Sequence, residues 1–216
     1  MATWEEIEDV IRTRFESQVQ DTTTVATIAG TVYSMDSADN SMSRSSGSFL
    51  TDGLSEQYKI SVTGFTESGN NTTFRIADAT ATKLLLTGNT VTTEVAGDSV
   101  SIAVRLPVHY DNAPGFRRPP ITKRWLWAAL TVQIDSNQVS TGGNNRFRHS
   151  GLAIVEFFVP EYVGTESVTQ LAQTTATAFR TLTASGLTFR TPSMQRIGED
   201  KRNVSMPFYS DEVVAV

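Results

Sequence analysis

The sequence predicts an α+β fold: a mixed sheet with two helices, into which a small all-β barrel or sandwich domain is inserted. Two segments, one near the start and one after residue 164, repeat apolar residues at helical spacing. Residues 25–103 lack that period and show short β-type runs separated by polar turns. We therefore assign residues 1–24 and 104–216 to an α+β core domain and residues 25–103 to an inserted all-β module.

The first element is predicted to be a helix that ends near Gln20. Thr3 can cap it, and Glu6 stands three residues later, which completes a capping box. Acidic residues fill the first turns, and Arg12 and Arg14 follow them, as the helix dipole favours. One apolar stripe contains Trp4, Ile7, Val10, Ile11, Phe15 and Val19.

The inserted module is predicted to contain only strands. Strand-type runs occupy residues 25–33, 58–62, 72–76, 83–87, 91–95 and 99–104. Glycine and asparagine turns separate them, such as Gly69-Asn70-Asn71. Strands repeated about every ten residues are typical of a small barrel or sandwich.

After residue 103 the pattern predicts strands, a helix and further strands. We expect strands at residues 104–110, 124–134 and 148–159, a flexible hairpin loop at 135–145, a helix at 164–183, short strands at 187–190 and 204–208, and a loosely held tail from 211. The helix should bury Val168, Leu171, Ala172, Thr175, Ala178, Phe179 and Leu182. The core of this domain is expected to include Trp125, Leu126 or Trp127, Ala129, Ile154, Phe157 and Leu171.

Charge is distributed unevenly along the chain, whose net charge is −5. Residues 1–24 hold two basic and six acidic residues (−4), residues 25–103 hold four and eight (−4), and residues 104–216 hold twelve and nine (+3). Segments of opposite charge favour head-to-tail self-association or docking on a partner. Differences of this size are also ordinary in globular proteins.

Catalytic and metal-binding patterns are weak in this sequence. The chain has no cysteine, and its two histidines, His109 and His149, lack the spacing of metal ligands. The serines at 45–48 lack a nucleophile elbow, and the carboxylate pairs Asp36/Asp39 and Glu199/Asp200 fall in turn-like segments. We therefore expect no enzyme, cofactor or metal. The acidic start and the short apolar runs also predict neither a signal peptide nor a membrane span.

Basic residues flank two loops and are the candidate interface residues. Prolines at 114, 119 and 120 prevent regular structure in the first loop. Guanidinium groups there could contact a carboxylate of a neighbouring subunit or partner, lie near DNA phosphates, or be solvated. The selected residues are Arg117, Arg118, Arg146 and Arg148.

Two sets of motifs resemble bacteriophage proteins. The sequence VHYDNAPGFRRPP at residues 108–120, followed by WLWAAL at 125–130 and RFRHSGLAIVEFFVP at 146–160, resembles the tail terminators of long-tailed phages. Within the insert, the motifs at residues 37–41, 62–65, 70–74 and 94–100 resemble β-modules of phage structural proteins.

The resemblance implies a structural protein of the virion, made in the host cytoplasm. A tail terminator forms a ring, a hexamer, at the head-proximal end of the tail tube, ends tube polymerisation and provides the head–tail joining surface. The implied partners are further copies of the chain, the tube protein and the head–tail connector, with DNA passing through the lumen. Two alternatives stay open: another neck or tail-tube component, or an adhesin that binds a surface or carbohydrate through the β-module.

Overall fold

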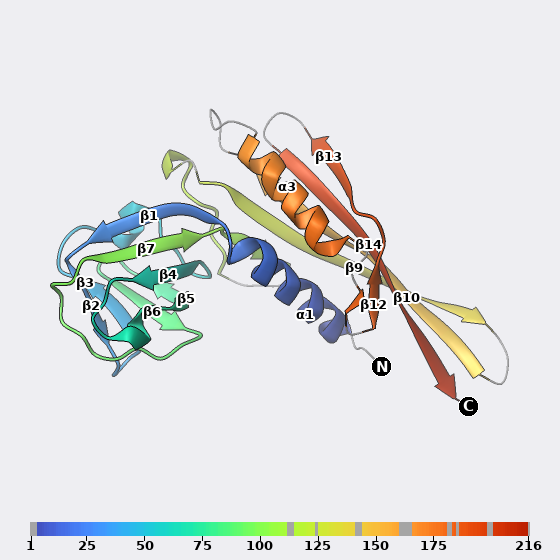
Figure 1. Ribbon diagram of the computed structural model, residues 1–216, viewed down its shortest axis with the longest axis horizontal. Helices are drawn as coiled ribbons and strands as arrows, with labels where there is room; N and C mark the ends of the chain where they lie inside the picture. The colour runs from blue at the N-terminus through green and yellow to red at the C-terminus, as the bar shows by residue number, and fades with distance from the viewer. Residues whose placement is uncertain are drawn as a thin grey trace. The chain divides into compact units, whose positions relative to one another are not determined.

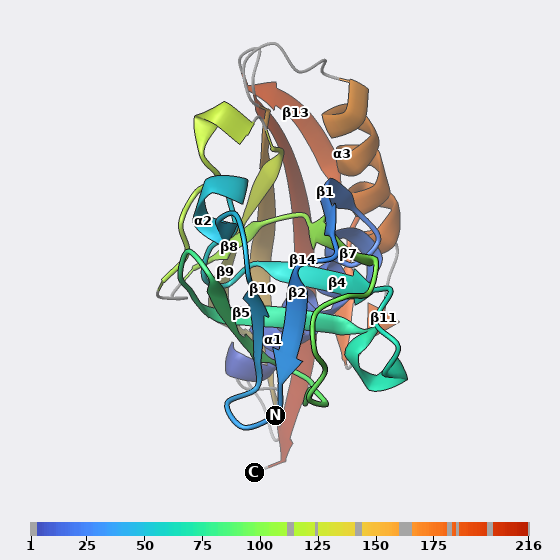
Figure 2. The same ribbon diagram turned by 90° about the vertical axis from the view of Figure 1, so that its left-hand side faces the viewer.

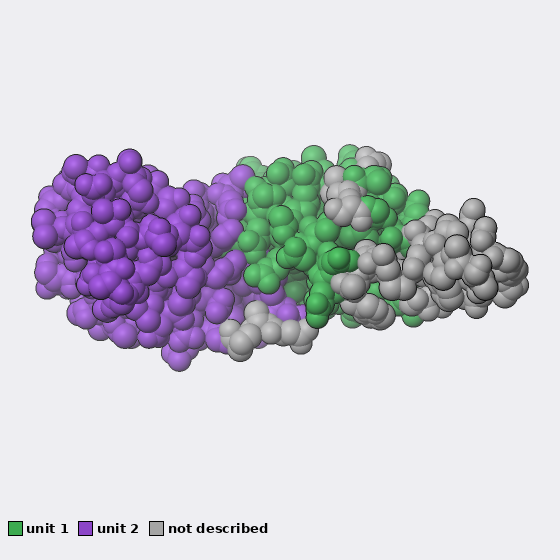
Figure 3. All heavy atoms as spheres, turned by 90° about the horizontal axis from the view of Figure 1, so that it is seen from below, with its two compact units in different colours: residues 1–20, 128–216 green, residues 21–127 purple. Residues whose placement is uncertain are grey.

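The computed structural model describes residues 4–111, 115–123, 125–140, 144–159, 166–180, 183–184, 186–197 and 201–215. It confirms an α+β protein that is mostly sheet (Figure 1). The chain divides into two compact units, coloured in Figure 3. Unit 1 comprises residues 1–20 and 128–216, and unit 2 comprises residues 21–127. The borders therefore differ from those expected at residues 24/25 and 103/104.

Unit 2 contains a seven-stranded sheet in which every neighbouring pair is antiparallel, turned toward the viewer in Figure 2. Its order is β1-β7-β4-β5-β6-β3-β2. The strands are β1 (Thr24–Gly30), β2 (Tyr33–Asp36), β3 (Ser41–Arg44), β4 (Lys59–Thr63), β5 (Thr73–Ala79), β6 (Lys83–Thr87) and β7 (Val100–Arg105), with short helices α2 (Phe49–Asp52) and η2 (Ser68–Asn70). Buried and partly exposed residues alternate along β7, as expected for a strand with one face on a core.

The core of unit 2 explains where its second border falls. Val104 and Trp125 are buried in the same cluster as Tyr58 and Phe74. Trp125 was expected in the other domain, and that expectation was wrong because its ring lies against Tyr58, with centroids 6.5 Å apart. This long-range contact cannot be read from local periodicity.

One strand expected in unit 2 is absent from the described structure. Residues 91–95 are irregular apart from a single bridge between Met35 and Glu94. Side-chain amides replace a neighbouring strand here: Val91 N donates to Asn40 Oδ1 at 2.8 Å, and Thr92 N donates to Asn70 Oδ1 at 2.9 Å. The backbone N–H groups of Val91 and Thr92 thus have hydrogen-bond partners although the segment is not paired as a β-strand.

Unit 1 begins with α1 (Trp4–Phe15), which continues as a π-helical turn η1 (Glu16–Gln20), and also contains α3 (Glu166–Phe179). The second sheet has the order β11-β12-β14-β10-β9-β8, and β13 also pairs with β14. Its strands are β8 (Val108–Tyr110), β9 (Trp127–Ser140), β10 (Asn144–Phe158), β11 (Thr183–Ala184), β12 (Leu187–Phe189), β13 (Ser193–Ile197) and β14 (Lys201–Ala215). β8 and the turn η3 (Ile121–Lys123), which precedes β9, belong to the residue range of unit 2.

The helical stripes were confirmed in most positions, but Val10 is only half-buried and the side chain of Trp4 lies outside the described residues. In α1–η1, Ile7, Ile11, Phe15 and Val19 are buried. In α3 the buried residues are Val168, Leu171, Ala172, Thr175, Ala176 and Phe179. The two helices contact each other, and α3 packs on β14 and β10. Ala178 is only half-buried, and Thr3 and Leu182 lie outside the described residues.

The strand faces were only partly predicted. Phe157 is buried as expected, but Ala129 and Ile154 are half-buried, and their neighbours Ala128 and Ala153 point into the core. Successive residues of a strand face opposite sides, so the face covered by the helices decides which set is buried. Leu126 and Trp127 are half-buried too.

The long strands extend beyond the expected ones. β9 continues to Ser140 and β10 begins at Asn144, so the loop expected at 135–145 is mostly strand. β14 pairs residue by residue with β10, from Lys201 opposite Phe158 to Ala215 opposite Asn144. The tail expected to be loose from Asp211 is therefore strand to Ala215, because β10 supplies a partner along its whole length.

Candidate functional site

The proline-rich loop is anchored to the core of unit 2 by aromatic contacts. Phe116 lies between Tyr58, His109 and Trp127, with ring centroids 6.0, 5.2 and 6.1 Å away. The hydroxyl of Tyr58 donates to the carbonyl oxygen of Arg117 at 2.8 Å. Burial raises the pKa of Tyr58, so its hydroxyl remains protonated as a donor.

The backbone of this loop also requires a glycine. Gly115 has a φ of +86°, and an added Cβ would lie 2.8 Å from Oε2 of Glu56. After the prolines, Lys123 N donates to the Pro120 carbonyl oxygen at 2.9 Å and forms the turn η3. The described part of the loop, from residue 115 to residue 123, is thus anchored through Phe116 and Arg117 and ends in the turn η3.

Two of the four candidate arginines lie on this loop. Arg117 and Arg118 are both exposed. The Arg118 guanidinium lies 5.1 Å from the centroid of the Trp127 ring, a cation–π contact that limits its freedom. A guanidinium stacked in this way keeps its N–H edge for a carboxylate or phosphate.

The other two candidates, Arg146 and Arg148, lie on β10 in unit 1. Their backbones pair with Val213 and Asp211 of β14. Their side chains lie outside the described part of the chain. Their role at an interface stays a prediction.

A polar cluster in unit 2 was missed by the sequence reasoning. Thr66 N donates to Glu94 Oε1 at 2.8 Å and to Asp98 Oδ2 at 2.7 Å. The buried Asn70 donates to Glu94 Oε2 at 2.8 Å and to the Thr92 carbonyl oxygen at 2.9 Å. Asn70, Glu94 and Asp98 belong to the motifs at 70–74 and 94–100, but the contact between these motifs was not predicted. The cluster joins two loops of the module.

This cluster predicts an acid-sensitive unit 2. The hydrogen bond with the Glu94 side chain, followed by those with Thr66, lowers the pKa of Asp98. Similarly, the hydrogen bond from Lys83 lowers the pKa of Asp39. A depressed folded-state pKa stabilises the fold above the unfolded-state pKa, and this stabilisation is lost as the pH falls through the folded value.

We therefore expect the melting temperature of unit 2 to decrease as the pH falls below about 4, the ordinary pKa of Asp. The melting temperature of the Asp98→Asn variant should decrease less than that of the wild type between about pH 7 and about pH 3, as measured by thermal melts. An equal acid loss in both proteins would contradict this assignment.

The remaining candidates for chemistry have structural contacts. Asp36 accepts from Ala38 N at 2.9 Å in a turn, and Ser48 accepts from Thr51 N as the cap of α2. His109 is half-buried against Phe116, whereas Glu199 and Asp200 and the side chain of His149 lie outside the described residues. Within the described ranges, no group of three or more His, Cys, Asp or Glu could hold a metal, and no helix is long and apolar enough to cross a membrane.

Comparison with known proteins gives no relative. No family model, no curated protein and no solved structure matches this chain.

Proposed function

We propose that this chain is a tail terminator of a long-tailed bacteriophage, a structural protein of the virion. It forms a hexameric ring at the head-proximal end of the tail tube, ends tube polymerisation and offers the joining surface to the head–tail connector. Its subunits bind the tube on one face and present no further tube-like edge on the other, so growth stops there.

The observation that supports this proposal best is the order of the helices and strands of unit 1 along the chain. A helix and a later sheet–helix–sheet segment form one α+β core, which a β-rich unit interrupts after the first helix. The phage-like motifs fall on the anchored proline-rich loop and on β9 and β10. Among the described catalytic candidates, Asp36 accepts a hydrogen bond within a turn and Ser48 caps α2.

The adhesin alternative is less well supported. A carbohydrate site usually needs exposed aromatic rings as platforms. The five aromatic residues of segment 25–103 are all buried in the core of unit 2: Tyr33, Phe49, Tyr58, Phe65 and Phe74.

The test of the ring is direct imaging of the purified chain by electron microscopy, with mass photometry for the subunit number. Rings of defined size are expected, whereas a tube component would polymerise into tubes of variable length. A chain that stays monomeric at every concentration and fails to bind tail tubes would overturn the proposal.

The arginines of β10 provide a sharper variant. The double substitution Arg146→Glu and Arg148→Glu should weaken ring assembly, most clearly at low salt, where screening is weak. Exposed ion pairs contribute only about 0.2–1 kcal/mol each, but a ring repeats the contact in every subunit. The matched control is Arg146→Lys with Arg148→Lys, which keeps the charge and should assemble. Equal assembly of both variants would exclude these arginines from the interface.

A further inference from the structure

A groove of about 630 Å³ lies in unit 1 between the end of the first helix and α3. Apart from Ala178, every lining residue has a hydrogen-bonding side chain. These residues are Arg14, Gln18, Gln170, Gln173, Thr174 and Thr177. A volume of this size falls in the range of ligand-binding clefts.

The outward face of α3 has an unusual composition for a solvated helix. Its exposed residues between Glu166 and Arg180 are all uncharged: Ser167, Gln170, Gln173, Thr174 and Thr177. Helix faces in water normally carry charged residues, and threonine is a poor helix former. Surfaces that contact other proteins are instead depleted of Lys, Glu and Asp. The composition of this face therefore favours contact over solvation.

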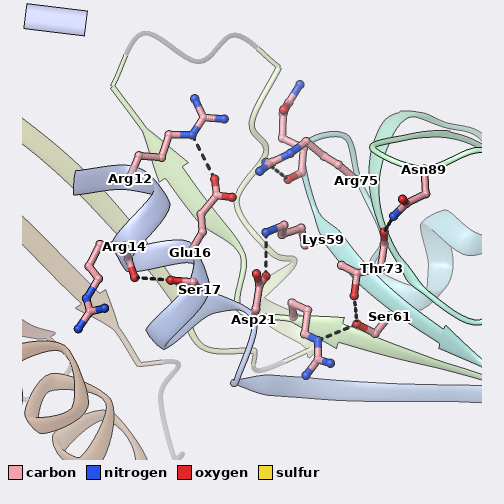
Figure 4. Close-up of polar contacts among 12 residues, drawn as sticks. Arg12, Arg14, Glu16, Ser17, Asp21, Lys59, Ser61, Thr73, Arg75 and Asn89 are labelled. Carbon is pink, nitrogen blue, oxygen red and sulfur yellow. Dashed lines mark hydrogen bonds and ion pairs between the residues drawn. The ribbon is translucent and has the colours of Figure 1, made fainter. Parts of the chain in front are cut away.

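Arg14 is the single charged residue of the lining. Its Nε and Nη2 both donate to the carbonyl oxygen of Ala178, at 3.2 Å, near the C-terminal end of α3. These two bonds orient the planar guanidinium, whose fork matches a carboxylate. Figure 4 shows that Arg12, on the same helix, points in a different direction and pairs with Glu16 at 3.1 Å.

The lining chemistry selects one class of ligand. It contains no carboxylate for a metal ion, no aromatic ring for a sugar, and too few cations for a nucleic acid. Glutamine and threonine side chains both donate and accept, as the backbone of an extended polypeptide does. Gln170, Gln173 and Thr177 follow one stripe of α3 over about 10 Å, the length of about three residues of extended chain.

We propose that this groove binds an extended segment of a partner protein, with an acidic side chain of that segment paired to Arg14. The backbone of the segment hydrogen-bonds to the glutamine and threonine side chains. This site goes beyond the proposed ring and does not depend on it, because the lining belongs to one chain.

The probe is a blocked hexapeptide of serine and threonine with one central glutamate, titrated into the full-length ¹⁵N-labelled chain and followed by NMR. We expect the side-chain amide signals of Gln18, Gln170 and Gln173 to shift at peptide concentrations up to about 10 mM. The same peptide with glutamine in place of glutamate should bind roughly two- to fivefold more weakly, the range for an exposed ion pair.

Two matched variants complete the test. Arg14→Gln can still donate to Ala178 but loses the charge. This variant should bind the glutamate peptide as weakly as the wild type binds the glutamine peptide. Arg12→Gln makes the same change two residues away and should leave binding unchanged, with thermal melts confirming that both variants are folded. The proposal is overturned if the groove amides do not shift, if both peptides bind equally, or if Arg12→Gln weakens binding as much as Arg14→Gln.

Discussion

Replacing Trp125 with alanine should lower the stability of unit 2 by about 3–5 kcal/mol, the usual loss for a large buried aromatic residue. Only 8% of Trp125 is exposed, and its ring packs beside Tyr58. It also covers Gly53, where an added Cβ would lie 3.2 Å from Cη2 of the indole. The truncated side chain would leave a cavity beside Tyr58 and Gly53.

The measurement is urea unfolding combined with amide hydrogen exchange, which reports on each unit separately. Amides of β4 and β7 should exchange faster in Trp125→Ala, whereas those of β10 and β14 should keep their protection. Trp127→Ala is the control, since this half-buried ring should cost clearly less. Faster exchange in β10 and β14, with β4 and β7 unchanged, would contradict the placement of Trp125 in the core of unit 2.

Gly151→Ala should disturb the centre of the long sheet and cost about 1–3 kcal/mol or more. Gly151 lies in β10 opposite Phe208 of β14. A Cβ added there would lie 2.3 Å from the carbonyl oxygen of Gln133 and 2.4 Å from Cζ of Phe208. Real Cβ atoms essentially never approach other atoms below 3.0 Å, so a strand or the phenyl ring must move.

Gly69→Ala provides the matched control for Gly151→Ala. The nearest atom to an added Cβ at Gly69 is Thr92 Oγ1, at 3.9 Å, and its φ is not positive. This substitution should be neutral or slightly stabilising, because alanine restricts the unfolded chain. Both variants are compared by urea unfolding. A Gly151→Ala protein within about 0.5 kcal/mol of the wild type would show that the sheet absorbs the methyl group without strain.

The sequence predicted the helices well because their signal is local. In α1 and η1 the apolar stripe from Ile7 to Val19 alone decides which face is buried. The ends of the units depend instead on contacts between distant residues. Tyr58 binds the backbone of Arg117, and this pairing moves residues 104–127 into unit 2. The residue patterns around Tyr58 and around Arg117 do not predict this contact.

The candidate sites show the same division between local and distant signals. The prolines around Arg117 and Arg118 predicted an irregular loop, and both arginines are exposed on it. By contrast, β13 has five exposed residues and no alternating apolar pattern, so only its pairing with β14 identifies it as a strand. The groove beside Arg14 was equally hidden, because it needs α1 and α3 side by side, from opposite ends of the chain.

In the sequence, α1 precedes unit 2, whereas the rest of unit 1 follows it, and this sets an order of events during synthesis. Unit 2, residues 21–127, is synthesised before β10 and α3, the elements that contact α1. At about 5–20 residues per second, residues 128–216 follow over roughly 5–20 s. Throughout that interval Ile7, Ile11 and Phe15 have no core to enter. Four acidic residues lie on the exposed side of the helix: Glu5, Glu6, Glu8 and Asp9. Their charges favour solubility of this segment until β10 and α3 have been made.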